Sequence, residues 1–487
     1  MRIARSFVLS AALALAASTA GCASTQSERN LAPLFTELSR GGGGTELELL
    51  GGAIRVRRAR PGAPFQQYAV RPFTIVDRTP TGETLSHFLT PFGTGRDAGS
   101  EYTWQLLPIA RYDRTVQPTG ELEWTFLSLP GIYWARRADG RTLRAVFPFG
   151  GVVEHFLSYD RLVFVLFPIF ARTERSGRIT YSFLFPVFAF TYGGGGGGWR
   201  VWPIYGRSKV EGSYDRTFVL WPIFHWEHND LWAAPEKQER KWMVFPLVGH
   251  TTRDTYHSTT VLWPFFGWAR NPKTDFWSWD GPWPLVRLHH DPQTDTFRTR
   301  FWPVYSHYHG DGLDSNWYLW PIVNVRSELY PNARKTGLYI LPFWQSWTRH
   351  DAVAGRSSFR KLWPLGQIER LEEHGMKFAF PALNPLWRTP EIDEMYAWIY
   401  EVYTRERDHD ILRERSWLGL YRREKDAAED RSSFVGLWGR RRYGKTTEMS
   451  VLFGLLRWRK TPSGSLEWMP PAIPGPGWPL ERESTGP

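Results

Sequence analysis

Residues 220–230 read LWPIFHWEHND, and residues 262–272 and 319–329 repeat the pattern as LWPFFGWARNP and LWPIVNVRSEL. In most units an aromatic residue or Leu precedes the proline. Seventeen such prolines, from Pro72 to Pro381, follow one another about every 19 residues, and Gly or another residue takes the proline position in the units beyond Pro381. A fixed period of this length predicts a tandem repeat with one architecture throughout.

Side chains alternate in character within each unit. Leu220 stands two residues before Pro222 and Phe224 two residues after it, whereas His225 occupies the next position. If a strand runs through the proline, Leu220, Phe224 and Trp226 share one large apolar face, and His225 lies on a smaller or more polar face. No segment shows helical periodicity. We therefore predict an all-β fold of about 21 tandem units.

The repeat permits several β architectures. Successive steps between prolines alternate between averages of about 20 and about 18 residues, which favours an up-and-down antiparallel meander with turns at two distinguishable ends. Apolar character spans nine residues per unit, about 30 Å of strand, which fits the apolar band of a membrane protein. Closure removes the edges of so wide a sheet. The sequence thus favours a large membrane barrel with Leu220, Phe224 and Trp226 facing lipid and His225 facing the interior.

Two alternatives remain open. A proline inside a paired strand forfeits a ladder hydrogen bond, and Trp221 and Ile223 would place bulky apolar groups in a wet lumen. A soluble creased β-sheet accounts for both facts. So does a β-hairpin solenoid, in which each unit is a hairpin and the proline occupies a corner between hairpins.

Composition bounds the class of protein. Hydrophobic residues make up 42% of the 487 residues and charged residues 22%, with 27 Trp, which excludes an intrinsically disordered chain. A single cysteine, Cys22, excludes an internal disulfide framework. Beyond the N-terminus no apolar run of 18 residues exists, so the pattern is not that of a helical membrane protein.

The N-terminus carries a targeting pattern. Arg2 and Arg5 precede the apolar stretch 7–17, and small residues lead to Thr19-Ala20-Gly21-Cys22, as in a secretory signal. The end of this segment resembles a bacterial lipobox, although Thr19 stands where that family prefers Leu. The resemblance implies that Cys22 is lipidated, and Ala23 resembles the residue found there in outer-membrane lipoproteins. We expect a lipid-anchored protein of the cell outer membrane, periplasmic or surface-exposed, with a mature net charge of +9 in place of +11.

Four regions are expected along the chain. Residues 1–21 form the signal peptide, 22–45 a lipidated N-terminus and Gly-rich linker, 46–460 a single β-repeat domain, and 461–487 a Pro/Gly-rich disordered tail.

Two motifs suggest chemistry, and each has a simpler structural interpretation. Residues 439–446, GRRRYGKT, match the phosphate-binding P-loop pattern, but they lie in register with the repeat and lack a strand-to-helix context. A hairpin turn is favoured. His307, His309 and Asp311, with His289-His290-Asp291 one unit earlier, have a spacing that suits a metal site, but polar residues at strand ends are the favoured interpretation.

These observations predict a non-enzymatic protein with no catalytic residue, cofactor or metal site. We expect a structural or pore-like outer-membrane β-barrel that contacts membrane lipids through lipidated Cys22 and the barrel surface, and neither nucleic acid nor nucleotide. The alternative is a repeat surface that binds glycans, lipopolysaccharide or other anionic envelope polymers. The aromatic-Pro repeats resemble those of uncharacterised bacterial envelope proteins, a resemblance that implies no activity.

Overall fold

The structure is a computed structural model that describes residues 25–40, 43–59, 65–371, 375–385 and 390–473. The predicted signal peptide, Cys22 and most of the C-terminal tail lie outside the described residues. The chain divides into two compact units. Unit 1 contains residues 1–107, 332–335 and 340–487, and unit 2 contains residues 108–331 and 336–339.

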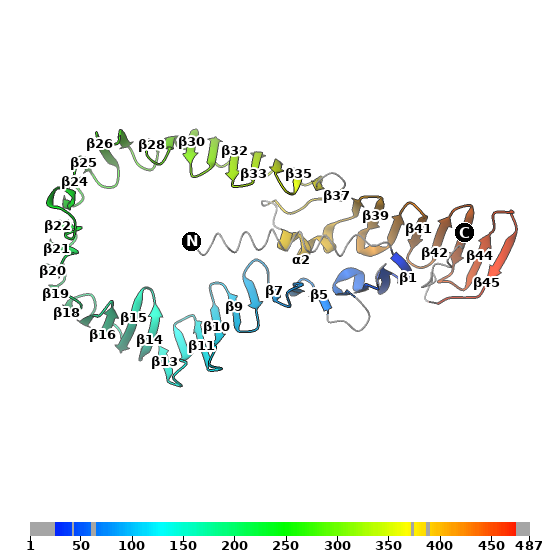
Figure 1. Cartoon of the computed structure of the whole chain (residues 1–487), viewed down its shortest axis with the longest axis horizontal. Coiled ribbons are helices and arrows are strands. Elements are labelled where there is room, and N and C mark those ends of the chain that lie inside the picture. The colour runs from blue at the N-terminus through cyan, green and yellow to red at the C-terminus, as the bar shows by residue number, and fades with distance from the viewer. Residues whose placement is uncertain (1–24, 41–42, 60–64, 372–374, 386–389, 474–487) are drawn as a thin grey trace. The chain divides into compact units, whose positions relative to one another are not determined.

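The predicted all-β class is confirmed. The described residues form 45 strands, short 3-10 turns and one helix (Figure 1). Unit 1 contains β1 (Thr25–Leu31), β2 (Phe35–Arg40), β3 (Thr45–Leu49), β4 (Ile54–Arg58), β5 (Phe65–Val70), β6 (Thr74–Arg78), β7 (Thr84–Phe88), β8 (Gly93–Asp97) and β9 (Glu101–Leu106). It also contains β34 (Trp344–Asp351), β35 (Gly355–Leu362), β36 (Gly366–Leu371), β37 (Gly375–Phe380), α2 (Pro390–Tyr400), β38 (Tyr403–Asp408), β39 (Ile411–Ser416), β40 (Tyr421–Lys425), β41 (Glu429–Phe434), β42 (Trp438–Tyr443), β43 (Thr446–Val451), β44 (Leu456–Lys460) and β45 (Leu466–Met469).

Unit 2 consists of strands that follow one another in a single layer. They are β10 (Ala110–Val116), β11 (Leu122–Ser128), β12 (Ile132–Arg136), β13 (Thr142–Val146), β14 (Gly150–Phe156), β15 (Tyr159–Val165), β16 (Phe170–Arg175), β17 (Arg178–Phe183), β18 (Phe188–Tyr192), β19 (Gly196–Val201), β20 (Tyr205–Val210) and β21 (Tyr214–Val219). The series continues with β22 (Phe224–Asn229), β23 (Glu239–Val244), β24 (Val248–Arg253), β25 (Tyr256–Val261), β26 (Phe266–Asn271), β27 (Phe276–Asp280), β28 (Val286–Asp291), β29 (Thr296–Phe301), β30 (Tyr305–Gly310), β31 (Leu313–Tyr318) and β32 (Val323–Tyr330). The next strand, β33 (Ala333–Ile340), contributes residues to both units.

Each repeat unit is a pair of antiparallel strands, with its proline in a turn outside them. β21 pairs with β22 from Tyr214↔Asn229 to Val219↔Phe224, and Pro222 lies in the turn that joins them. The predicted antiparallel meander is confirmed, but no described strand runs through the proline, so each unit contributes two short strands in place of one long strand. A proline in the turn forfeits no ladder bond, which removes the difficulty that the sequence raised. One hairpin per unit was part of the alternative solenoid prediction.

The predicted barrel is not formed. Among the described residues, β1 pairs only with β2 and β45 only with β44, so no pairing closes the meander. Most strands are five or six residues long, against the 9–11 residues or so of a membrane-spanning β-strand. Every repeat proline lies in a turn from an odd- to an even-numbered strand or just after β37, so the alternating step lengths do not report two ends of the sheet.

Three regions differ from the sequence prediction. Helix α2 lies where no helix was expected, although Pro390 at its first position and Glu391 and Asp393 in its first turn are typical helix-start residues. β1 and β2 occupy most of the predicted N-terminal linker. β45 lies within the predicted disordered tail. The repeat therefore begins and ends outside the boundaries 46 and 460, because polar strands such as TQSERNL carry no apolar signal.

The two units have different interiors. In unit 2 a small apolar cluster forms around Tyr133, Leu143, Val153 and Phe164. In unit 1 the apolar cluster of Ala69, Ile75 and Met395 joins α2 to β5 and β6, and much of the remaining interior is charged. No helix among the described residues is long and apolar enough to cross a membrane.

Candidate functional site

The aromatic-Pro turns share one geometry. In the turn Leu220-Trp221-Pro222-Ile223, the N–H of Ile223 donates to the carbonyl of Leu220 at 2.8 Å, and the Trp221–Pro222 bond is cis. A cis-proline at the third position of a four-residue turn is the type VI arrangement. Sixteen of the 17 repeat prolines follow a cis bond, so most units turn in this way.

Successive turns are bonded to one another. Trp221 N–H donates to the carbonyl of Pro203 in the preceding turn at 2.6 Å, and Leu220 N–H donates to Ile204 at 2.7 Å. The rings before the prolines also meet, since the Trp202 and Trp221 centroids lie 5.6 Å apart. The turns therefore form a continuous ladder along one edge, which we call the proline edge.

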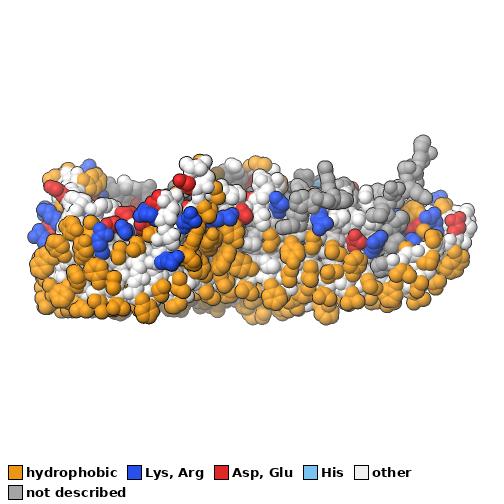
Figure 2. Space-filling model, turned by 90° about the horizontal axis from the view of Figure 1, so that it is seen from below, with side chains coloured by type: hydrophobic (Ala, Val, Ile, Leu, Met, Phe, Trp, Pro, Cys, Tyr) orange, Lys and Arg blue, Asp and Glu red, His pale blue; other side chains and the backbone are white. Residues whose placement is uncertain are grey.

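The proline edge is apolar and exposed. The fourth residue is exposed in most of these turns, as Ile204 at 59% and Phe149 at 67% show, and so is the first residue where it is Leu. Figure 2 shows hydrophobic side chains gathered along one edge and most charged side chains toward the other. Exposed side chains of this edge in unit 2 include Leu129, Phe149, Leu166, Ile169, Leu184, Ile204, Leu220, Ile223, Leu247, Leu262, Phe265, Leu285, Val304, Leu319 and Ile322.

One face of unit 2 extends this apolar edge, and we call it the aromatic face. The pairings Val219↔Phe224 and Thr217↔Trp226 place Phe224 and Trp226 on the same face, as predicted, and His225 lies opposite them. Leu220 belongs to the turn instead of this face. Exposed side chains of the aromatic face include Phe183, Phe188, Phe190, Trp199, Trp226, Trp242, Phe266, Trp268, Trp277, Trp279 and Phe301.

The opposite face is lined by small residues because large groups fold over it. A Cβ on Gly206 would lie 2.3 Å from the Phe218 ring, so only glycine fits at this position. Phe147, the ring before Pro148, packs against Phe164 at 6.1 Å on this face. The small residues three positions after the prolines therefore serve packing.

Basic residues follow the aromatic rows toward the other edge. Arg144 lies over the Trp134 ring at 5.1 Å, and Arg172 over Tyr181 at 5.8 Å. Arg207, which pairs with Asp215 at 2.6 Å, and Lys209 lie on the same face of β20. Polar hairpin turns such as residues 211–213 complete this edge. From the proline edge outward, unit 2 thus changes from aliphatic to aromatic to charged.

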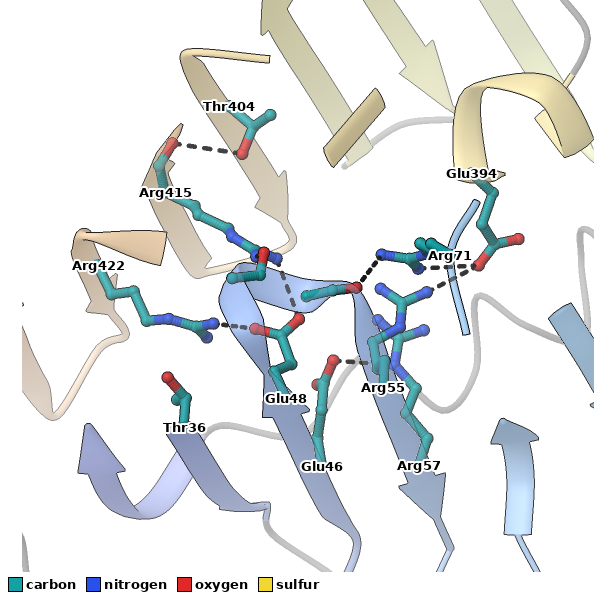
Figure 3. Close-up of polar contacts among 12 residues, drawn as sticks. Thr36, Glu46, Glu48, Arg55, Arg57, Arg71, Glu394, Thr404, Arg415 and Arg422 are labelled. Atoms are coloured by element: carbon teal, nitrogen blue, oxygen red, sulfur yellow. Dashed lines mark hydrogen bonds and ion pairs between the residues drawn. The ribbon is translucent and has the colours of Figure 1, made fainter. Parts of the chain in front are cut away.

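Unit 1 contains a second candidate site, a cluster of buried ion pairs (Figure 3). Glu48 on β3 accepts hydrogen bonds from Arg415 on β39, at 3.0 Å, and from Arg422 on β40. Glu46 pairs with Arg40 at 2.6 Å and with Arg57 at 3.0 Å. The contacts of Glu48 join the N-terminal strands to strands more than 360 residues later.

Helix α2 adds an acid to this cluster. Glu394 accepts a hydrogen bond from Arg55 at 2.8 Å and another from Gln67 at 2.7 Å, and Arg71 lies 4.0 Å from the same oxygen. Arg71 also donates to the carbonyl of Gly52 at 3.3 Å. We call Arg40, Glu46, Glu48, Arg55, Arg57, Arg71, Glu394, Arg415 and Arg422 the ionic cluster.

The environment of the ionic cluster shifts its pKa values. Burial alone would raise the pKa of Glu48, but Arg415 and Arg422 outweigh it and lower that pKa from 4.5 to about 2. Burial would also raise the pKa of Glu394, but the neighbouring Arg55 guanidinium outweighs burial, and the pKa is lowered. Burial, followed by repulsion from Arg57 and Arg71, lowers the pKa of Arg55 to about 9. The cluster therefore holds ionised carboxylates and a guanidinium whose charge is costly.

The sequence motifs lie elsewhere. Residues 439–446 form the end of β42, a two-residue turn and the start of β43, with Tyr443↔Thr446 as the last pair, so the predicted hairpin is confirmed. His307 and His309 share a face, and both approach Asp314, at 3.5 and 3.1 Å. His289 lies on the other face of its sheet, paired with Ser278 and Arg298. Asp311 lies in the turn after β30. Across the described ranges no group of three or more His, Cys, Asp or Glu side chains is arranged to hold a metal ion.

Sequence reasoning did not find the ionic cluster. Its acids and bases lie on short polar strands, such as TELEL (β3) and IRVRR (β4), at opposite ends of the chain. The alternation of Glu46 and Glu48 with Leu was the available signal, since it places both carboxylates on one face of a strand. Nothing in the sequence indicated which face is buried.

Comparisons with known proteins supply no family. No protein-family model and no curated protein matches the chain. Among solved structures, the WD40 domain of SCAP from fission yeast aligns over 82% of this chain and 84% of its own length, with 11% identity and a TM-score of 0.09. A TM-score this low does not indicate a shared fold.

Proposed function

We propose that this protein is a non-enzymatic envelope lipoprotein that seats its proline edge in one leaflet of a lipid bilayer. The observation that carries the proposal is the exposed row of aliphatic turn residues, bordered by the aromatic face and then by Arg and Lys. Aromatic side chains favour the membrane–water interface, and basic side chains favour anionic headgroups. An apolar surface of this extent on a protein edge marks an interaction site.

The height of the strands supports insertion into one leaflet. A strand of six residues is about 20 Å long, and its half nearest the proline edge, with the turn, extends about 10–15 Å. A single leaflet provides about 15 Å of hydrocarbon. The apolar part therefore matches half a bilayer, and the charged turns of the opposite edge stay in water.

Lipidation of Cys22 would supply a second anchor. One acyl chain holds a protein to a membrane only marginally, whereas two signals together give stable attachment. An apolar edge combined with a lipidated N-terminus fits this requirement. The lipobox resemblance and the mature charge of +9 support placement at the outer membrane, where anionic groups attract a basic protein.

The alternative function, binding of glycans, lipopolysaccharide or other anionic polymers, draws support from the same face. Exposed rings such as Trp199 and Trp226 lie in rows beside Arg207 and Lys209, and aromatic and basic groups together suit a sugar that carries phosphate or carboxylate. Membrane seating is favoured, because the aliphatic turn residues at the proline edge have no role in sugar binding.

Vesicle flotation tests the proposal. The mature chain without lipid, residues 23–487, is mixed with phosphatidylethanolamine–phosphatidylglycerol vesicles at high salt, which screens headgroup attraction. We expect it to float with the vesicles. Replacing Ile204, Ile223 and Phe265 with Asp should lower the bound fraction about tenfold or more, because burial of each side chain contributes about 2 kcal/mol.

A matched variant places three Asp residues on the opposite edge, at Ser213, Gln293 and Thr294. This variant has the same net charge as the first, and its flotation should equal that of the unmodified chain. If the unmodified chain stays in the aqueous fraction, or if both variants lose binding equally, the proline edge is not the membrane contact. Binding of soluble lipopolysaccharide sugar without flotation would instead support the alternative.

A further inference from the structure

A cavity of about 490 Å³ lies beside the ionic cluster in unit 1. Its walls come from β1 to β4, β35 to β41 and α2. Arg55, Arg71, Glu394, Arg415 and Arg422 are among the residues that line it. Small-molecule sites in proteins commonly have volumes of about 300–1,000 Å³. The cavity is therefore large enough for a small ligand.

Positive charge is concentrated at one part of this wall. The whole lining carries ten basic and ten acidic side chains, whereas the ionic cluster contains six guanidinium groups and three carboxylates. Two of the other acids that line the cavity have basic partners in its walls: Glu424 pairs with Arg413 at 3.2 Å, and Glu414 pairs with Arg423 at 3.5 Å. Within the ionic cluster, Arg40 and Arg57 share Glu46, and Arg55 and Arg71 share Glu394. A local excess of positive charge therefore lies around Arg55, Arg57 and Arg71.

Several of these guanidinium groups have N–H donors without an acceptor. Among the described residues, Nε of Arg55, Arg71 and Arg422 and Nη1 of Arg40 and Arg431 are buried and make no hydrogen bond. Arg55, Arg71 and Arg431 are 8%, 6% and 3% exposed. Buried donors that belong to charged groups are costly to leave unpaired. All five arginines line the cavity, so they retain donors for an anion bound there.

We propose that this cavity binds a small phosphate-bearing anion, held chiefly by Arg55 and Arg71. Planar guanidinium groups pair with phosphate oxygens through two parallel hydrogen bonds, which an isolated amine does not reproduce. The anion would also offset the repulsion among Arg55, Arg57 and Arg71. Arg71 precedes Pro72 and therefore belongs to a turn of the proline edge in unit 1. The vesicle test changes only turns of unit 2, so failure of the anion site would leave the membrane proposal untouched.

Glu394 is the residue that an anion would displace or compete with. It is the carboxylate nearest to both Arg55 and Arg71, at 2.8 and 4.0 Å. A purely structural cluster and a binding site therefore predict opposite results for Glu394→Gln. Loss of a structural ion pair weakens the site, whereas removal of a competing negative charge strengthens anion binding.

Isothermal titration calorimetry on the full-length protein in detergent tests the inference. Inorganic phosphate and glycerol phosphate are the free probes, and short-chain phosphatidylglycerol micelles are the lipid probe. We expect saturable binding of a free probe at constant ionic strength if the ligand is a soluble solute. Binding of the micelles alone, abolished by Arg71→Met, assigns the same site to a lipid headgroup.

Two variants and a control define the site. Arg71→Met should weaken binding of the active probe about tenfold or more, and Glu394→Gln should strengthen it about threefold or more, because one charge pair changes in each. Arg136→Met, an exposed arginine of unit 2, should change it less than about twofold. The proposal is overturned if the unmodified protein binds none of the probes, which needs no variant to fold, or if Arg136→Met weakens binding as much as Arg71→Met.

Discussion

The two units build the same hairpin repeat into different interiors. In unit 2 each strand contacts mainly its neighbours in sequence, and its aromatic face is exposed. In unit 1 the N-terminal strands face strands from the C-terminal part of the chain, and Glu46, Glu48 and Arg55 lie buried between them. The proline turns occur in both units. The repeat therefore determines the turns, whereas the side chains between them determine whether a second layer covers the sheet.

The two units differ most in the charge of the side chains on their strand faces. Unit 2 places rings such as Phe224 and Trp226 on its exposed face, and unit 1 places Glu and Arg at its internal contact. A buried ion pair contributes little net stability, but loss of one partner is costly because a charge remains without its counterion. Removal of single charges should therefore affect the two units very differently.

The largest contrast is expected for Glu48→Ala. Arg415 and Arg422 would keep their charges without the carboxylate that lies 4% exposed between them, so unit 1 should lose about 3–5 kcal/mol. Hydrogen-exchange mass spectrometry in increasing urea reports the free energy of opening for peptides of each unit. Glu211→Ala, in an exposed turn of unit 2, is the control and should stay within about 0.5 kcal/mol. Equal loss in peptides of both units would show that they do not differ in this way.

Lowering the pH should also destabilise unit 1 more than unit 2, by somewhat less than Glu48→Ala does. Glu48 has a folded pKa of about 2 against an ordinary value of 4.5, so its stabilisation is complete above pH 4.5 and is lost as the pH falls toward 2. The loss reaches about 3 kcal/mol for this group, and the lowered pKa values of Glu46 and Glu394 act in the same direction. Exchange protection in unit 1 should fall between pH 4.5 and 2, before that of unit 2. Unchanged protection of unit 1 at pH 2.5 would contradict the ion-paired interior.

The smallest change in stability is expected for a substitution in unit 2, Tyr133→Phe. The Tyr133 hydroxyl accepts a hydrogen bond from Arg137 at 3.1 Å and donates to the carbonyl of Glu154 at 3.2 Å. Tyr133→Phe should therefore cost about 1 kcal/mol, confined to peptides of β12 to β14, because each strand relies on its neighbours. Tyr318→Phe, at a 46% exposed ring, is the matched control. A loss that extends to β28 or beyond would show that unit 2 unfolds as one body.

The regular part of this fold was open to sequence reasoning. The 19-residue period, the all-β class, the shared face of Phe224 and Trp226 and the hairpin at residues 439–446 follow from spacing and alternation. The strand prediction failed at the prolines, because the apolar residues on both sides of Pro222 form a continuous pattern that is typical of one long strand. In the structure, Leu220 and Ile223 are apolar turn residues, and apolar turns are rare where a turn faces water.

The repeat pattern did not predict the ionic cluster or α2, for a different reason. Glu48 and Arg422 are separated by 374 residues, and a period of 19 says nothing about which distant strands meet. Met395 is fully buried, yet a single three-turn helix inside a long β pattern is easily read as part of an irregular unit. Long-range contacts of this kind depend on which distant strands pack together in unit 1.

The contact between Thr25 and Glu424 has a consequence for the order of folding. The Thr25 hydroxyl donates to Glu424 at 2.9 Å across 399 residues. Hairpins of unit 2 have low contact order, so each is able to form as soon as its own residues emerge during synthesis or export. The first strands of unit 1 also pair with their neighbours, but the contacts that bury their charged faces must wait for nearly the whole chain. Their charged faces stay in water without harm during that delay, whereas apolar faces would invite aggregation. A polar interior thus suits a layer whose second half arrives last.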